Sequence, residues 1–262
     1  MLRITSAQNA RFRDASRLIE SSRDRRKTGK CVLEGEHLIA VYAERVGMPE
    51  SVIVSEDALR RPAIEALVRR IDPVVVVVPA TLFARLASLP AGVGMIAVVP
   101  TPRAEPQGPD DFCVLLEDVQ DPGNVGSILR TVAAAGADRL VLSRGCAFAW
   151  APKVLRAGQG AHFLLAIDEG VNLAAWCARF ARTEGRVIAT LARGGASLYD
   201  TPLTGRVAMV FGNEGAGISA ELQRHVSTAV TIPMPGGMES VNAAAAAAIC
   251  VFERVRQAAK DV

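Results

Sequence analysis

Polar side chains that could take part in chemistry are concentrated in three stretches of the chain after residue 114. They are Asn124 and Arg130 in LLEDVQDPGNVGSILRT, Glu214 in VAMVFGNEGAGIS, and Ser240 with Asn242 in VTIPMPGGMESVNAA. Each stretch begins with an apolar run and then breaks into Gly, Asn, Ser or Pro, which is typical of a buried strand that ends in a loop. In open α/β sheets ligands bind beyond the carboxyl ends of strands. The pattern therefore predicts one shared pocket.

Neither of two familiar nucleotide-binding fingerprints explains these loops. The glycine spacing of a dinucleotide site is absent, and so is the Gly-Lys-Ser/Thr of a phosphate-binding loop. A purely structural interpretation takes Asn124 and Ser240 as helix caps and Glu214 as an acid in a first helical turn. That interpretation does not explain why an arginine, Arg130, occurs in an otherwise apolar helix.

The elements that must position these residues alternate between apolar strands and amphipathic helices along the whole chain, which predicts an α/β fold. Residues 100–111 (PTPRAEPQGPDD) contain four prolines and no apolar periodicity, so they indicate a linker. We therefore expect an N-terminal domain over residues 1–100, a linker over 101–111 and a second domain over 112–262.

Charge is unevenly distributed along the chain. Residues 1–30 hold nine Arg or Lys residues against three acids, whereas the whole chain has a net charge of only +3. This pattern fits a nucleic-acid contact or, equally, a solvated helix face. The candidate RNA contacts are Arg11, Arg25, Arg26, Lys27 and, from the second domain, Arg130.

Other classes of site have little support in the sequence. The five cysteines are widely spaced without a CxxC pair, and the three histidines lie far apart, so no metal is expected. The longest apolar run is too short to cross a bilayer, and the N-terminus lacks the apolar segment of a signal peptide. We expect a cytoplasmic protein without membrane contact.

The three motifs resemble those of the SpoU (TrmH) family of RNA ribose 2′-O-methyltransferases, within the SPOUT superfamily. The matching segments are NVGSILRT, VFGNEGAGIS and IPMPGGMESVN. The N-terminal half is similar to the substrate-binding domain that precedes many of these enzymes, through ITSAQNARFRD, LEGEHL and GVGMIAVV. Two departures are SVNAA where the family often has SLNVS, and Gly158 where a Ser is usual.

The resemblance implies a trefoil-knotted methyltransferase domain with a parallel sheet, which works as a homodimer. It implies S-adenosylmethionine as cofactor and structured RNA, most simply ribosomal RNA, as substrate. Carried over by motif, the catalytic residues are Asn124, Arg130, Glu214, Ser240 and Asn242. The implied cofactor contacts are Thr190, Leu191, Ala192, Gly212, Asn213, Gly217, Ile232, Met234, Val241 and Asn242.

The resemblance also assigns Arg130 the role of general base. A guanidinium group holds its proton too tightly to be an ordinary base, so we favour a role in orienting the substrate phosphate and stabilising the developing alkoxide. Ser240 and Asn124 would position the hydroxyl, while Glu214 and Asn242 would hold the loops and Arg130.

Two alternatives for the function stay open at the level of sequence. One is a transfer RNA 2′-O-methyltransferase, and the other is a non-catalytic RNA-binding protein of the same fold. Aromatic residues make up only 5% of the chain, which disfavours a surface that stacks single-stranded bases. A dehydrogenase or hydrolase lacks its fingerprint.

Overall fold

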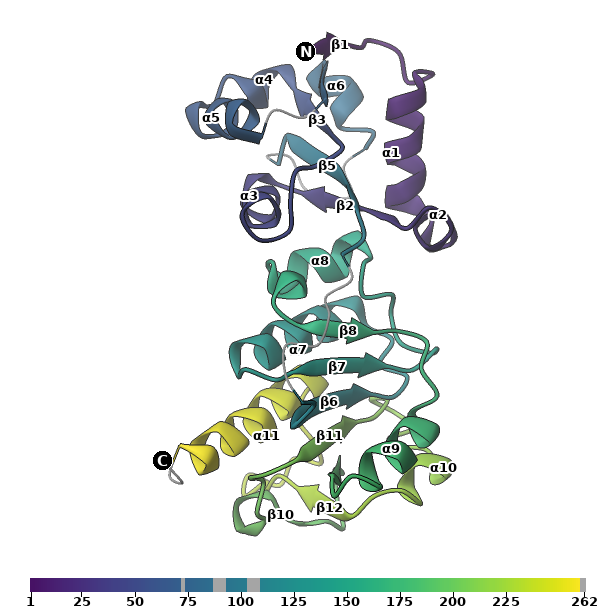
Figure 1. Ribbon diagram of the computed structural model, residues 1–262, viewed down its shortest axis with the longest axis vertical. Helices are drawn as coiled ribbons and strands as arrows, with labels where there is room; N and C mark the ends of the chain where they lie inside the picture. Colours follow the sequence, from purple (N-terminus) through teal and green to yellow (C-terminus); the bar gives the residue numbers. More distant parts are fainter. Residues whose placement is uncertain (72–73, 87–92, 103–108, 260–262) are drawn as a thin grey trace. The chain divides into compact units, whose positions relative to one another are not determined.

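The computed structural model describes residues 1–71, 74–86, 93–102 and 109–259. The chain divides into two compact units (Figure 1): unit 1 comprises Met1–Pro102 with Trp150–Phe163, and unit 2 comprises Arg103–Ala149 with Leu164–Val262. Residues 103–108 of the predicted linker lie outside the described residues. Strand β5 (Met95–Pro100) ends before this segment and β6 (Phe112–Leu116) begins after it.

Unit 1 is a mixed sheet with helices on both faces. Its strands are β1 (Leu2–Arg3), β2 (Lys30–Glu34), β3 (Ser51–Ser55), β4 (Val74–Val78) and β5. Its helices are α1 (Ala10–Glu20), α2 (Ser22–Thr28), α3 (Glu36–Arg45), α4 (Glu56–Leu59), α5 (Pro62–Ile71), α6 (Ala80–Phe83), α8 (Pro152–Gly158) and a short 3-10 turn at Ala161–Phe163. The strand order is β1-β4-β3-β5-β2, and β5 runs antiparallel to both β3 and β2.

The sheet of unit 1 forms because its strands are rich in β-branched residues, as in the VVVVV of β4. Phe12, Ala15 and Leu18 line one side of α1 and pack into a cluster with residues of β2, β3, β4 and β5. Helix α8 packs against β2. A segment from the middle of the sequence therefore completes this unit.

Unit 2 carries the three motifs and has a wholly parallel sheet. Its strands are β6, β7 (Arg139–Leu142), β8 (Ala166–Asp168), β9 (Arg186–Thr190), β10 (Ala196–Ser197), β11 (Val207–Phe211) and β12 (Thr228–Thr231). Its helices are α7 (Pro122–Ala134), α9 (Leu173–Ala181), α10 (Ala220–Gln223), α11 (Ala243–Ala258) and a short 3-10 turn at Leu198–Asp200. The order is β10-β12-β9-β11-β6-β7-β8, with every pairing among these strands parallel.

Helices cover both faces of the sheet in unit 2. Helices α9 and α10 contribute to a cluster with Cys113, Leu115, Ala208 and Val210 of the central strands, whereas α7 and α11 pack together elsewhere in the unit (Figure 1). Both faces of β6 and β11 are therefore buried, which explains their uninterrupted apolar sequences. The predicted α/β class with a parallel sheet is confirmed.

Within the described residues, no helix combines the length and hydrophobicity that a membrane span requires. Likewise, the described part of the chain contains no group of three His, Cys, Asp or Glu side chains that could hold a metal ion.

Candidate functional site

A cavity of about 500 Å³ opens at the carboxyl ends of β9, β11 and β12. It lies where the parallel strands stop and their loops begin, as expected for an open α/β sheet. Its lining consists of Thr190, Leu191, Ala192, Phe211, Gly212, Asn213, Glu214, Gly215, Ala216, Gly217, Val230, Ile232, Met234, Ser240, Val241, Asn242, Ala243 and Ala246. All ten residues predicted as cofactor contacts are in this set, and so are three of the five predicted catalytic residues.

The three motifs meet beside this cavity in a chain of hydrogen bonds. The Asn242 side-chain amide donates to Asn124 Oδ1 at 3.0 Å, and the Asn124 amide donates to Glu214 Oε1 at 2.7 Å. These residues are 118 and 90 positions apart in sequence, respectively. The tertiary structure thus brings one residue of each motif into direct contact.

Helix packing explains how the asparagines meet. Asn242 is the N-cap of α11, and its side chain accepts hydrogen bonds from Ala244 N and Ala245 N. Asn124 lies in the first turn of α7, whose N-cap is Asp121. Because α7 and α11 pack together, the starts of the two helices place these side chains together. The helix caps are therefore Asp121 and Asn242, which corrects the structural interpretation that assigned them to Asn124 and Ser240.

The loop of residues 212–217 takes its shape from Asn213. Its side-chain oxygen accepts from Gly215 N and Ala216 N, both at 2.9 Å, and its main chain pairs with Gly217 in both directions. A Cβ on Gly212 would lie 2.4 Å from the carbonyl of Gly217. Only glycine therefore allows the two ends of this loop to approach so closely.

Several lining residues were missed by sequence reasoning. Phe211 and Val230 are strand residues that were expected only as core, and Ala243 with Ala246 lie at the start of an alanine run without chemical character. Only their place next to predicted contacts could have identified them.

Arg130 stands apart from the other predicted catalytic residues. It lies in the second half of α7, is exposed and is absent from the cavity lining. Among the described residues its guanidinium makes no hydrogen bond or ion pair. Within one copy of the chain, then, Arg130 is available to an incoming group but does not line the cavity.

The predicted RNA contacts in unit 1 divide into two kinds. Arg11, Arg26 and Lys27 are exposed, and Arg11 and Lys27 line a cavity of about 500 Å³ in this unit. Arg25 is only 5% exposed, and its guanidinium donates to the carbonyls of Leu18 and Ile19 at the end of α1. The expected RNA contact at Arg25 is therefore wrong, because the side chain is occupied in satisfying that helix end.

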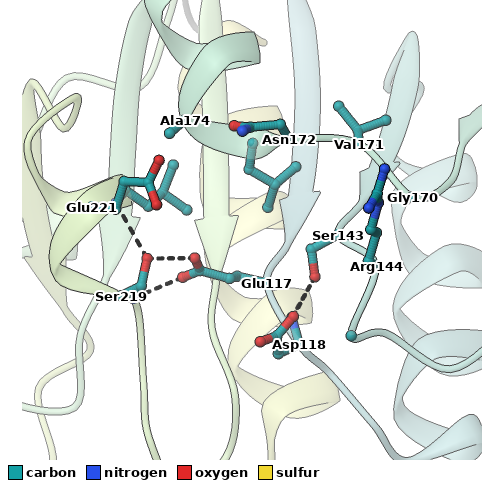
Figure 2. Close-up of a pocket in the computed structure, with 13 residues that line it drawn as sticks. Glu117, Asp118, Ser143, Arg144, Gly170, Val171, Asn172, Ala174, Ser219 and Glu221 are labelled. Carbon is teal, nitrogen blue, oxygen red and sulfur yellow. Dashed lines mark hydrogen bonds between the residues drawn. The ribbon is translucent and has the colours of Figure 1, made fainter.

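A second cavity in unit 2, of about 520 Å³, lies at the carboxyl ends of β6 and β7 (Figure 2). Glu117, Asp118, Ser143, Arg144 and Ser219 are among its lining residues. Figure 2 shows Glu117 facing Ser219, and Asp118 facing Ser143, with hydrogen bonds drawn between them. Glu117 and Asp118, which follow β6, therefore line the second cavity and not the first.

Cys146 is a half-buried thiol next to this second cavity, and its surroundings disfavour a thiolate. Cys146 Sγ donates to Leu116 O at 3.2 Å, and burial raises the pKa of the thiol above its ordinary value. A thiol that stays protonated at neutral pH is a poor nucleophile.

Comparison with known proteins identifies the family. Residues 111–252 match the SpoU rRNA Methylase family. The 23S rRNA (guanosine(2553)-2′-O)-methyltransferase RlmP of Bacillus subtilis (strain 168) is 30% identical over 252 residues, which cover 96% of this chain and 98% of the relative. RlmB of Xanthomonas campestris pv. campestris, a 23S rRNA (guanosine-2′-O-)-methyltransferase, is 37% identical over 145 residues, or 55% of this chain and 58% of the relative.

A solved structure agrees with these relatives. The SpoU methyltransferase AviRb from Streptomyces viridochromogenes, in complex with the cofactor AdoMet, superimposes with a TM-score of 0.85 at 25% identity and covers 96% of this chain and all of that chain (100%). The likeness thus extends over both units. This chain belongs to the SpoU rRNA methylase family, as its three motifs predicted.

Proposed function

We propose that this protein transfers a methyl group from S-adenosylmethionine to a ribose 2′-hydroxyl of ribosomal RNA. The observation that carries the proposal is the hydrogen-bonded chain Asn242–Asn124–Glu214 beside a loop-lined cavity, in a member of this family. The relatives named above are 23S rRNA 2′-O-methyltransferases, which favours ribosomal over transfer RNA.

The cavity fits such a cofactor by size and by lining. Its volume of about 500 Å³ is within the ~300–1,000 Å³ common for small-molecule sites. Its wall includes Gly212, Gly215 and Gly217, whose lack of a side chain lets a ligand approach the main chain closely. Thr190 is on this wall, but its hydroxyl donates to Val210 O at 2.8 Å, so it braces two strands. We infer that backbone groups and apolar side chains hold the cofactor.

When bound, S-adenosylmethionine supplies an electrophilic methyl group on its sulfonium sulfur. The methyl carbon leaves sulfur and joins the ribose oxygen, and the hydroxyl proton leaves to solvent. Glu214 and Asn242 hold the loops beside the cavity, and Ser240, which lines it, would position the ribose hydroxyl. We place Arg130 on the substrate phosphate and the developing alkoxide, because it is exposed and has no partner among the described residues.

The RNA surface is proposed to include Arg11, Arg26 and Lys27, which are exposed on unit 1. Arg25 is not part of it. Lysine and arginine contacts to phosphate supply affinity without sequence information, so the choice of nucleotide must come from RNA shape or from other contacts.

Dimerisation is proposed from exposed apolar residues of unit 2. Met238 is 71% exposed, Phe252 47% and Val241 37%, and these side chains are the candidate contacts with a second copy of the chain. The trefoil knot and a cytoplasmic location stay predictions. A homodimer would allow Arg130 of one copy to act at the cavity of the other. The mass of the protein in solution measures whether it is a dimer.

The test uses purified protein, S-adenosylmethionine with a labelled methyl group, and unmodified ribosomal or transfer RNA. Label on a ribose of ribosomal RNA is expected. Arg130→Ala should lower the methylation rate by about 100-fold, the scale of losing one donor to a developing oxyanion, while the cofactor Kd is unchanged. Arg182→Ala, an exposed arginine just after α9, is the matched control.

Two outcomes would contradict the proposal. Tight RNA binding without transfer of label would favour the non-catalytic alternative, and label on transfer RNA alone would replace the substrate. A wild-type rate in Arg130→Ala would remove that residue from the mechanism.

A further inference from the structure

The loop between the two cavities of unit 2, residues 212–219, forms hydrogen bonds with the residues that directly follow β6. Residues 212–217 line the first cavity, and Ser219 lines the second. Residues 214–217 are exposed, and the nearest apolar anchor is Ile218, which is buried in the core of unit 2. Polar contacts hold the loop on either side of its exposed part.

Glu117, the first residue after β6, holds one end of this loop. Its Oε2 accepts from Ser219 N at 2.8 Å, and its Oε1 accepts from Ser219 Oγ at 2.6 Å. Ser219 is also the N-cap of α10 and accepts from Leu222 N. One carboxylate therefore fixes both the main chain and the side chain of Ser219 (Figure 2).

Asp118 holds the other end through its main chain. Its carbonyl accepts from the Asn213 side-chain amide at 2.9 Å. Asp118 is in the left-handed region at φ 54°, and Ser143 Oγ both accepts from its N–H at 2.9 Å and donates to its carboxylate at 2.5 Å. This local network stabilises the turn that presents the carbonyl to Asn213.

From this geometry we propose that Glu117 and Asp118 form a clamp that positions the loop of residues 212–219 for the cofactor and for catalysis. The clamp holds Asn213 at one end of the loop and Ser219 at the other. Glu214, which bonds to Asn124, lies between them. The inference rests on the proposed cofactor role of the first cavity. Glu117 is a positioning residue, because it lines the second cavity and acts on the first one only through Ser219.

The physical reason is an ordering cost. A glycine-rich loop that is free in the unbound protein must lose conformational entropy when it closes on a ligand. A loop already held by charge-assisted hydrogen bonds has lost that entropy during folding. Breaking the clamp therefore weakens cofactor binding, and it lowers kcat because Glu214 also loses its place.

The experiment compares variants of the full chain at a temperature where circular dichroism shows each to be folded. Glu117→Ala should raise the S-adenosylmethionine Kd by about tenfold or more, as expected for losing hydrogen bonds to a charged group. Glu117→Gln keeps one acceptor without the charge and should be intermediate. Ser219→Ala keeps only the main-chain bond to Glu117, and in combination with Glu117→Ala its effect should not be additive.

Hydrogen exchange supplies a readout that needs no cofactor. Amides of residues 212–219 should exchange faster in Glu117→Ala, whereas those of β6 and β11 should not. The matched control is Glu221→Gln, whose carboxylate lines the same cavity but makes no hydrogen bond or ion pair among the described residues.

The outcomes separate the clamp from the proposed function. A wild-type Kd in folded Glu117→Ala, or an equal loss in Glu221→Gln, would overturn the clamp. A loss of thermal stability with unchanged Kd, kcat and loop exchange would reduce Glu117 to a structural role and likewise overturn it. If the wild-type protein binds no S-adenosylmethionine, the cofactor assignment fails, and loop exchange alone decides whether the clamp exists.

Discussion

At the scale of single residues, Asn124 makes contacts that its motif did not suggest. Its expected role, to position the ribose hydroxyl, stays a prediction, while its amide is engaged at both ends with Glu214 and Asn242. An amide can do this because it offers a donor and an acceptor on one rigid group. We infer that Asn124 connects the other two motifs.

Substitution of Asn124 tests that connecting role. Asn124→Ala should lower kcat about tenfold, the scale of a hydrogen bond to a charged partner. Asn124→Asp should lower it further, because a carboxylate cannot donate to Glu214 and repels it. The rate at saturating cofactor and RNA is the measurement, and Ser127→Ala on the same helix is the control. Equal rates for Asn124→Asp and wild type would show that the contact is dispensable.

At the scale of elements, the site exists because parallel strands end together. The carboxyl ends of β9, β11 and β12 share one edge of the sheet, and each is followed by a loop that lines the cavity. The loop after β11 must turn back on itself at Gly212, where a Cβ would meet the backbone of Gly217.

Gly212→Ala should therefore damage the cavity wall. Overpacking of this kind costs about 1–3 kcal/mol, so the S-adenosylmethionine Kd should rise roughly tenfold. Calorimetric titration measures the change. Gly236→Ala is the matched control, because a Cβ there meets no atom within 4 Å. An unchanged Kd in Gly212→Ala would mean that the loop can shift without effect on the ligand.

At the scale of the whole molecule, the order of the sequence and the division into units differ. The segment Trp150–Phe163 interrupts unit 2 in sequence but belongs to unit 1. In α8 the side chains of Val154 and Leu155 are buried, and Arg156 forms an ion pair with the buried Glu34 of β2. The predicted second domain, 112–262, includes this segment, and its boundaries stay a prediction.

Leu155→Ala should destabilise unit 1 more than unit 2. Leu155 is only 1% exposed, so its truncation should lower the free energy of unfolding by about 2–5 kcal/mol. The chain has two tryptophans, Trp150 and Trp176, which lie in unit 1 and unit 2, respectively. Denaturant unfolding followed by fluorescence in Trp176→Phe and Trp150→Phe backgrounds measures each unit. Equal shifts in both backgrounds would show that the units unfold as one.

The sequence was most informative where local pattern and chemistry coincide. The apolar runs that end in glycine-rich loops predicted the strands β11 and β12 and the residues of the cavity, since strand ends and ligand loops are local features. It failed at Arg25, because a basic residue in a polar run is expected on the surface. The end of α1 decides the outcome, because its carbonyl groups accept hydrogen bonds from the Arg25 guanidinium.

The sequence by itself determined the family, the α/β class and the identity of the cavity-lining loops, because motif residues and apolar periodicity are written in the order of the chain. The tertiary structure decided which distant residues touch. The contact of Asn124 with Glu214 and Asn242, the hold of Glu117 on Ser219 and the transfer of α8 to unit 1 all join positions far apart in sequence. Such pairs depend on helix packing and strand order, which no local pattern encodes.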